Sequence, residues 1–204
     1  MITDSAAQLL LATNNVDKVA EIRQFLNGLH FQIITLAAFP QIPPVEEDQS
    51  TLQGNAIKKA QTLAQATGLL TLADDTGLEV DALNGRPGVL SSRYAGANAS
   101  YDANVDKLLL DMQDITPSLR TARFCCVIAI AEGDKVETVD GICEGVILDC
   151  RQGNGGFGYD PVFYLPEIGA TFAEMSIEEK NRISHRGLAL MKARQVLEKK
   201  LAAF

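Results

Sequence analysis

The chain has 204 residues, of which 47% are hydrophobic and 22% are charged, the balance of a globular protein rather than a disordered or fibrous one. Acidic residues outnumber basic ones 26 to 18, which gives a formal net charge of −8. Because a net negative surface repels nucleic-acid phosphates, this composition argues against binding to DNA or RNA. It leaves room for a small anionic ligand, since a few basic side chains can gather at one site.

The length predicts one domain, with at most a modest added lobe. The four cysteines include no CxxC pair, and Cys125 and Cys126 are adjacent in an apolar run, which argues against a zinc site or a disulfide framework. No basic leader opens the chain, and the longest apolar stretch, residues 124–131, is far shorter than the ~20 residues of a spanning helix. We therefore expect a cytoplasmic protein that does not associate with a membrane.

The first third of the chain alternates short apolar runs with helical periodicity. Residues 8–12 predict a buried strand, and apolar residues at helical spacing then follow Asn15. A second strand is predicted over 31–36, and a helix capped by Thr51 follows a proline-rich loop. A third strand over 69–73 is expected to end at Asp74-Asp75. Alternating strands and helices predict an α/β fold.

The remainder of the chain predicts longer strands. A helix over 101–111 precedes two β runs, 120–131 and 135–148, joined by a hairpin signal at Glu132-Gly133-Asp134. Long antiparallel strands inside an α/β chain indicate a mixed sheet or a second lobe. After these come a glycine-rich loop at 153–160, a short strand at 162–165, a capping box formed by Ser176 and Glu179, and a last helix opened by Ser184.

The turn after the first predicted strand is a candidate phosphate site. The N–H groups at a helix start are unpaired and lie at the positive end of the helix dipole. The short polar side chains there and the charge of Lys18 would add to this attraction. The segment lacks the glycine pattern of a Walker loop, and a simple helix cap with a solvated lysine is the alternative. Its residues are Thr13, Asn14, Asn15, Val16, Asp17 and Lys18.

Two acidic segments are candidates for a metal site. Residues 46–48 are Glu-Glu-Asp, and Asp74-Asp75 follows a predicted buried strand. Carboxylates from two loops suit Mg²⁺, a hard cation that keeps several waters, and one carboxylate could also orient or deprotonate a water. Because neighbouring side chains of a strand point to opposite faces, Asp74 and Asp75 are expected to play different roles. The alternatives are a solvated charge run at 46–48 and a turn at 74–77.

Two further segments are suited to a flat polar ligand. The glycine-rich loop would let the backbone approach a ring closely, with Phe157 stacking on it and Asp160 accepting hydrogen bonds. Lys180, His185 and Arg186 could hold a phosphate or donate to a purine carbonyl. A flexible connection with one core aromatic, and a histidine that merely packs, are the alternatives.

Taken together, these segments resemble the inosine/xanthosine triphosphate pyrophosphatase family, which removes non-standard purine nucleotides. The matching blocks run in family order from residue 9 to about residue 190. They are LATNNVDKVAEI at 11–22, ADDTGLEV at 73–80, GRPGVLSSRYAG at 85–96, GFGYDP at 156–161 and MSIEEKNRISHR at 175–186. Five ordered blocks are far more specific than any one motif.

The resemblance implies an α/β fold with an elongated mixed β-sheet flanked by helices, in two lobes with a central cleft. It implies one pyrophosphatase domain over residues 1–204, a homodimer, and a Mg²⁺-dependent reaction that converts ITP, dITP or XTP to the monophosphate and pyrophosphate. Donors at the purine 6-position would then reject adenine, whose 6-amino group is itself a donor. A pyrophosphatase of broader specificity and a nucleotide-binding module without turnover are the alternatives. A dinucleotide-binding oxidoreductase is disfavoured, because its glycine fingerprint is missing.

The resemblance also assigns residues. Asp75 would be catalytic and, with Glu46, would bind the metal. Substrate would be bound by Thr13, Asn14, Asn15, Val16, Asp17, Lys18, Thr76, Phe157, Gly158, Tyr159, Asp160, Lys180, His185 and Arg186. The sequence departs from the family where a glycine is expected three residues after the metal-binding glutamate, so that Glu47 remains the alternative to Glu46. Leu90 also stands where an aromatic residue is frequent.

Overall fold

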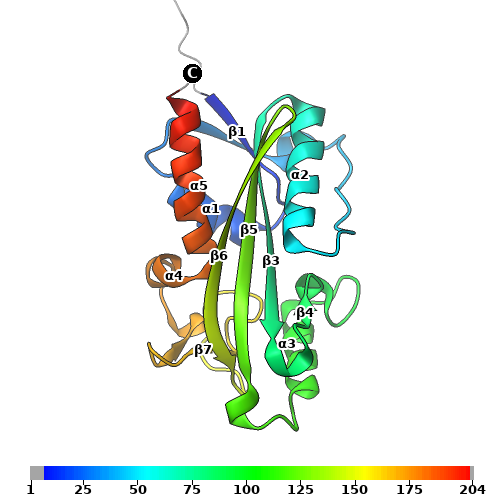
Figure 1. Ribbon diagram of the computed structural model, residues 1–204, viewed down its shortest axis with the longest axis vertical. Coiled ribbons are helices and arrows are strands. Elements are labelled where there is room, and N and C mark those ends of the chain that lie inside the picture. Colours follow the sequence, from blue (N-terminus) through cyan, green and yellow to red (C-terminus); the bar gives the residue numbers. More distant parts are fainter. Residues whose placement is uncertain (1–6, 203–204) are drawn as a thin grey trace, which may run out of the picture. The chain divides into compact units, whose positions relative to one another are not determined.

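The structure is a computed structural model that describes residues 7–202, in which a mixed β-sheet is accompanied by five α-helices (Figure 1). This confirms the predicted α/β class. The strands are β1 (Ala7–Leu11), β2 (Phe31–Thr35), β3 (Leu70–Val80), β4 (Pro87–Gly88), β5 (Thr121–Glu132), β6 (Lys135–Ile147), β7 (Phe163–Leu165) and β8 (Ala170–Thr171). The helices are α1 (Val16–Phe25), α2 (Leu52–Thr67), α3 (Tyr101–Asp111), α4 (Ile177–Ile183) and α5 (His185–Leu201).

The strand order is β2-β1-β3-β5-β6-β7-β8, and β4 pairs with β3 off this path. Strand β1 runs parallel to both β2 and β3, with Leu10 opposite Ile34 on one side and Thr71 on the other. The pairs β3–β4, β6–β7 and β7–β8 are antiparallel. The parallel part comes from the βαβ segment at the start of the chain, and the antiparallel part from the later strands, as the sequence predicts.

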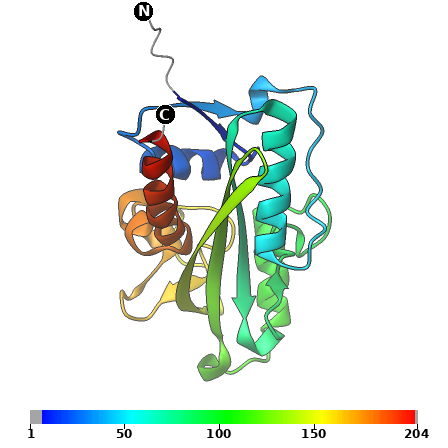
Figure 2. The same ribbon diagram turned by 45° about the horizontal axis from the view of Figure 1, so that its top comes forward.

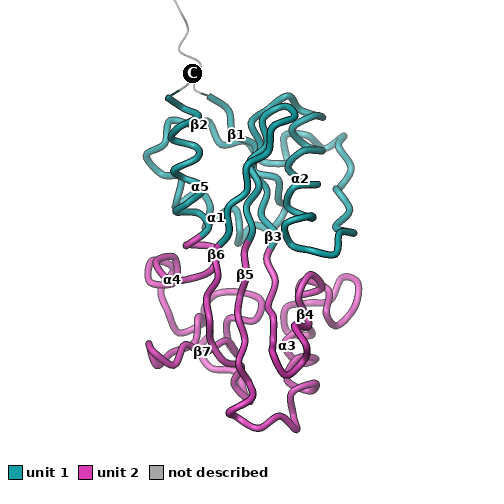
Figure 3. Tube along the Cα trace, in the orientation of Figure 1, with its two compact units in different colours: residues 1–75, 127–140, 189–204 teal, residues 76–126, 141–188 magenta. Residues whose placement is uncertain are grey.

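The chain divides into two compact units (Figure 3). Unit 1 comprises residues 1–75, 127–140 and 189–204, and unit 2 comprises residues 76–126 and 141–188. Strands β3, β5 and β6 each begin in one unit and end in the other. The single domain over 1–204 and its central cleft stay predictions.

Unit 1 buries its strands under helices on both sides. Helix α2 lies on one side of the strands, and α1 and α5 lie on the other (Figures 1 and 2). Leu9, Leu10 and Leu11 are all fully buried, as expected for a strand covered on both faces. The α2 face that meets the strands is built of small residues spaced by four, Ala56, Ala60 and Ala64, which lets the helix approach closely.

Unit 2 has its own core. Phe124 packs against Phe163 and Phe172, with ring centroids 4.6 and 6.0 Å apart. Leu108 and Met112 of the α3 region join the same cluster and are fully buried. The predicted caps of α2 and α4 are confirmed, because Thr51 accepts from Gly54 N–H and Ser176 forms a capping box with Glu179.

One predicted boundary is wrong: the third strand does not end at Asp74-Asp75. Strand β3 continues to Val80, and neither a turn at 74–77 nor a loop forms there. The run of polar residues is typical of a turn in a sequence, but here the two carboxylates are buried and paired. The strand therefore continues through them and pairs with β4 at Leu78 and Glu79. Between residues 7 and 202, none of the helices combines the length and apolar character that crossing a bilayer requires.

Candidate functional site

Side chains of the turn between β1 and α1 accept hydrogen bonds from main-chain N–H groups of the same turn. The Asn15 side chain accepts hydrogen bonds from the N–H groups of Asp17 and Lys18 at 2.9 and 3.2 Å, and Thr13 Oγ1 accepts from Asn15 N–H at 3.1 Å. Asn15 is thus the N-cap of α1. Two of the N–H groups expected to bind phosphate point to this cap, so phosphate binding at the turn stays a prediction.

Asp74 and Asp75, adjacent in β3, have different partners. Asp74 is paired with Lys18, whose Nζ lies 2.9 Å from Oδ2, and the Asp74 side chain is fully buried. Asp75 accepts a hydrogen bond from Asn55 Nδ2 at 3.0 Å. This agrees with the expectation that neighbouring side chains of a strand serve different roles. Lys18 is therefore held beside a carboxylate rather than surrounded by solvent.

Lys59 of α2 joins this group, although the sequence reasoning did not select it. Its Nζ donates to the Asp74 main-chain oxygen at 2.6 Å and to Glu47 Oε1 at 2.7 Å, and lies 3.6 Å from Asp75 Oδ1. One signal could have found Lys59 in the sequence. Asn55 and Lys59, spaced by four, are polar residues on the buried face of a helix that is otherwise lined by alanine. Buried polar residues on such a face require partners, and here the partners are the acidic residues.

The pKa values of Asp75 and Lys59 both rise, for opposite reasons. Burial raises the pKa of Asp75, and the neighbouring Glu47 charge adds to it, while the Lys59 charge works against it. Burial alone would lower the pKa of Lys59, but the charges of Asp75, Asp74 and Glu47 outweigh burial and raise it. Asp75 is thereby a better proton acceptor than an exposed aspartate, and Lys59 stays charged.

Of the two candidate metal-binding glutamates, Glu47 reaches this group. Glu47 contacts Lys59, whereas Glu46 is solvent-exposed. The contact of Glu47 with Lys59 keeps the alternative, Glu47, in consideration, and the identity of the metal-binding glutamate stays a prediction. We call Lys18, Glu47, Lys59, Asp74 and Asp75 the carboxylate–lysine cluster; it lies within unit 1.

The carboxylates of this cluster fit a divalent cation. Glu47 and Asp75 approach the same ammonium group, so their negative ends already converge on one positive charge. Among residues 7–202 no group of three or more His, Cys, Asp or Glu side chains could hold a metal ion. A pair of carboxylates is the donor set suited to Mg²⁺, which retains several waters.

A second group forms in unit 2 around Phe157. Asp160 Oδ2 accepts from Phe157 N–H at 2.8 Å and from Lys180 Nζ at 2.6 Å. Lys180 Nζ and Arg186 Cζ lie 4.7 and 5.4 Å from the centre of the Phe157 ring. Arg186 also donates to Thr76 Oγ1 at 3.2 Å. The structure thus links five residues that the sequence predicted for the site, because Thr76 joins the other four through Arg186. We call those four, Phe157, Asp160, Lys180 and Arg186, the aromatic–cation cluster.

Two other predicted residues are placed in the core of unit 2. His185 is 2% exposed, and its ring stacks on Phe124 with centroids 4.5 Å apart. Tyr159 is 5% exposed and donates its hydroxyl to Ser91 O at 2.8 Å. Burial raises the pKa of that Tyr159 hydroxyl. Both side chains support the fold around the cluster, and their contact with substrate stays a prediction.

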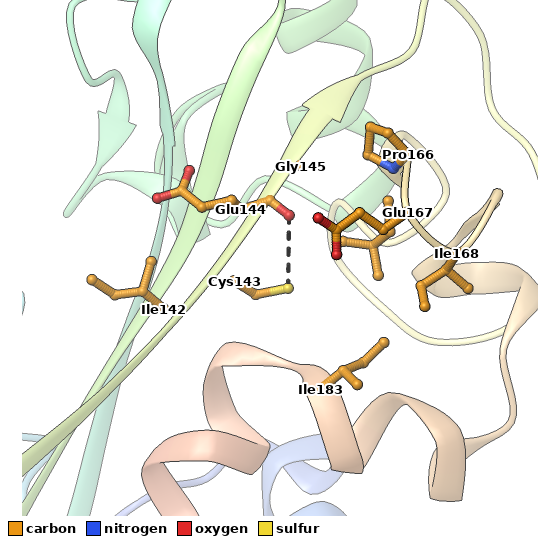
Figure 4. Close-up of a pocket in the computed structure, with 9 residues that line it drawn as sticks. Ile142, Cys143, Glu144, Gly145, Pro166, Glu167, Ile168 and Ile183 are labelled. Carbon is orange, nitrogen blue, oxygen red and sulfur yellow. Dashed lines mark hydrogen bonds between the residues drawn. The ribbon is translucent and has the colours of Figure 1, made fainter.

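A cavity of about 500 Å³ in unit 2 lies apart from these residues (Figure 4). Ile142, Ile168 and Ile183 contribute apolar surface to its wall, and Glu144 and Glu167 contribute charge. None of the predicted site residues lines it.

The fold and the two clusters define an α/β protein with a mixed sheet, carboxylates converging on a buried lysine, and an aromatic ring beside two cations. The first cluster suits an anionic group with a divalent cation, and the second suits a flat polar ring. The family model described as the Ham1 family matches residues 9–196, and this chain belongs to that family.

Curated relatives cover nearly the same length. The chain is 52% identical over 193 residues to a dITP/XTP pyrophosphatase of Desulforamulus reducens, covering 94% of this chain and 96% of that relative. It is 52% identical over 184 residues to a dITP/XTP pyrophosphatase of Geobacter sulfurreducens, covering 90% and 92%. The solved structure of a HAM1 protein from Coxiella burnetii superposes with a TM-score of 0.87 at 43% identity, covering 95% of this chain and 99% of that one.

Proposed function

We propose that this protein hydrolyses the non-standard purine nucleotides dITP, ITP and XTP to the monophosphate and pyrophosphate. Family membership and two relatives at 52% identity named dITP/XTP pyrophosphatase support this proposal. The observation that carries it is the convergence of Glu47 and Asp75 on Lys59. This arrangement places the buried Asp75 carboxylate, a proton acceptor, beside a lysine whose positive charge can offset phosphate charge.

The carboxylate–lysine cluster would act on the triphosphate. Lys18 and Lys59 supply positive charge against the phosphoryl oxygens, and the start of α1 adds its dipole. Glu47 and Asp75 would hold Mg²⁺, which would neutralise part of the charge that develops on the phosphates. Because the cluster contains three carboxylates and two ammonium groups, its negative charge is in excess, and a divalent cation would turn this excess into a net positive charge that faces the triphosphate.

In the chemical step, the oxygen of a water attacks the α-phosphorus and the α–β anhydride bond breaks, so that pyrophosphate leaves. Asp75 orients this water and accepts its proton, a role that its raised pKa favours. Asn55 holds the Asp75 carboxylate in place through the 3.0 Å hydrogen bond. Such catalysis consists mainly of positioning and charge stabilisation.

The aromatic–cation cluster would select the base. Phe157 offers a ring for stacking, and Lys180 and Arg186 are donors suited to the O6 carbonyl of inosine and xanthosine. Adenine presents a 6-amino donor instead and would leave these groups unpaired, a kind of mismatch that can cost ~10⁴-fold in specificity. We also propose that the protein works in the cytoplasm as a homodimer and binds neither nucleic acid nor membranes.

The decisive test is a panel of dITP, XTP, ITP, the four common dNTPs and dUTP, assayed with Mg²⁺ and with pyrophosphate and orthophosphate measured separately. We expect pyrophosphate release from dITP, XTP and ITP and much slower turnover of dATP. Intact dITP and XTP, or release of orthophosphate alone, would contradict the proposal. Comparable rates on all substrates would instead indicate a general pyrophosphatase.

A further inference from the structure

Tyr101, the first residue of α3, places a second aromatic ring beside Phe157. The two ring centroids are 5.8 Å apart and the planes are inclined by 41°. Both residues belong to unit 2. No motif used to predict the site includes Tyr101, which lies 56 positions before Phe157 in the chain. Its place beside that ring is therefore a finding of the tertiary structure.

The fold does not account for the exposure of this ring. Tyr101 is 44% exposed, unlike Val105 and Leu108 of the same helix, which are buried in the unit 2 core. The start of α3 is already capped, because Ser100 accepts a hydrogen bond from Ala103 N–H. A large aromatic ring left partly in water beside a ring proposed to stack on a base adds apolar surface where a base would lie.

The Phe157 ring is held in place from several directions. Its main-chain N–H donates to Asp160, and Lys180 and Arg186 contact its ring. Those two cations are themselves held by Asp160 and Thr76. Tyr101 is thus an aromatic neighbour of a fixed ring, and its own ring, inclined by 41° to that of Phe157, extends the aromatic surroundings beyond the edge of the Phe157 ring.

We propose that Tyr101 is a further nucleobase-contacting residue and that it increases the preference for purines over pyrimidines. This inference rests on the proposed function. A purine that stacks on Phe157 has a second fused ring that can reach the inclined Tyr101 ring, whereas a pyrimidine stacked on Phe157 has no such second ring. Stacking depends on the area of π-surface in contact, so the second ring benefits the larger base more.

The test compares Tyr101→Ala and Tyr101→Phe with Leu110→Ala, which removes an exposed side chain from the same helix. For dITP we expect Tyr101→Ala to raise KM about 5- to 10-fold, within the range for loss of one base–aromatic contact, with kcat nearly unchanged. Tyr101→Phe keeps the ring and should stay within about twofold of wild type, as should Leu110→Ala. Binding of dIMP by calorimetry should weaken in parallel, and the ratio of dITP to dUTP turnover should fall.

A double variant separates direct contact from an effect through Phe157. If Tyr101 contacts the base, Tyr101→Ala still weakens dIMP binding in a Phe157→Ala background. If it only positions Phe157, that second loss disappears, and the proposal is overturned. An unchanged KM and dIMP affinity in folded Tyr101→Ala would also overturn it, with thermal unfolding as the check on folding. Failure of the wild-type protein to hydrolyse dITP or XTP would instead refute the proposed function.

Discussion

Each unit contains a buried lysine paired with a carboxylate, but the surroundings of the two lysines differ. Lys59 lies against the Glu47 carboxylate, the Asp74 carbonyl oxygen and, farther away, Asp75. Lys180 lies against the Asp160 carboxylate and over the rings of Phe157 and Phe172 at 4.7 and 5.5 Å. One lysine is surrounded by oxygen and the other largely by aromatic carbon.

The two clusters also differ in the ratio of carboxylates to cations. The carboxylate–lysine cluster holds three carboxylates against two ammonium groups, whereas the aromatic–cation cluster holds one carboxylate against two cations. An excess of carboxylate suits a divalent cation, and an excess of donors beside a ring suits the carbonyl edge of a base. In the proposed function unit 1 would supply the chemistry and unit 2 the recognition, so variants in unit 1 should lower kcat and variants in unit 2 should raise KM.

The largest effect is expected from Asp75→Asn. The amide keeps the shape of the side chain but cannot accept the proton from water, so kcat for dITP should fall by about 100-fold or more, with little change in KM. Steady-state kinetics with pyrophosphate detection measures both constants. A folded Asp75→Asn protein with near wild-type turnover would remove Asp75 from the mechanism and break the assignment of chemistry to unit 1.

Substitution of Lys59 should affect both stability and activity. Lys59→Met leaves Glu47, Asp75 and the Asp74 carbonyl oxygen without their ammonium partner, which should cost about 2 kcal/mol or more in urea unfolding. Lys58→Met is the matched control, because the neighbouring Lys58 pairs with Asp48 at the surface and its loss should change stability by less than about 0.5 kcal/mol. Equal effects of the two substitutions would show that the buried contacts of Lys59 contribute no more than a surface pair.

The two adjacent glutamates provide a test of the metal site. Glu47→Gln should raise the Mg²⁺ concentration needed for half-maximal turnover by about tenfold, since it removes one of two proposed ligands. Glu46→Gln should leave this concentration nearly unchanged, because Glu46 is exposed, whereas Glu47 contacts Lys59. A Mg²⁺ titration of each variant decides between them, and the reverse order of effects would restore Glu46 as the ligand.

A smaller effect is expected from Gly156→Ala in unit 2. Gly156 has a φ of +68°, and an added Cβ would collide with the Asp160 carboxylate that holds Phe157 and Lys180. The loop must shift, and we expect KM for dITP to rise about fivefold with kcat preserved. As a control, Gly133→Ala changes a positive-φ glycine in the β5–β6 turn, where nothing lies within 4 Å. A fall in kcat alone for Gly156→Ala would contradict the assignment of recognition to unit 2.

Features that depend on neighbours in the chain were predictable from the sequence. The local features are the helix start at residues 13–15, the Thr51 and Ser176 caps, the helix over 101–111 and the hairpin signal at 132–134. Each follows from residues within a few positions of one another. The family was also recognisable, because its motifs are local blocks in a fixed order. Asp75 was selected in this way, as a carboxylate in one of those blocks.

The tertiary structure decided which of these residues meet. Lys59 is 12 positions from Glu47 and 16 from Asp75, and only the packing of α2 against β3 brings them together. Asp74 and Asp75 lie within a strand, although their polarity is typical of a turn, and Glu47 contacts Lys59. The core of unit 2 takes in Tyr159 and His185, while Tyr101 is left exposed beside Phe157. Burial and long-range pairing depend on how distant segments pack, and the local pattern of a sequence does not contain that information.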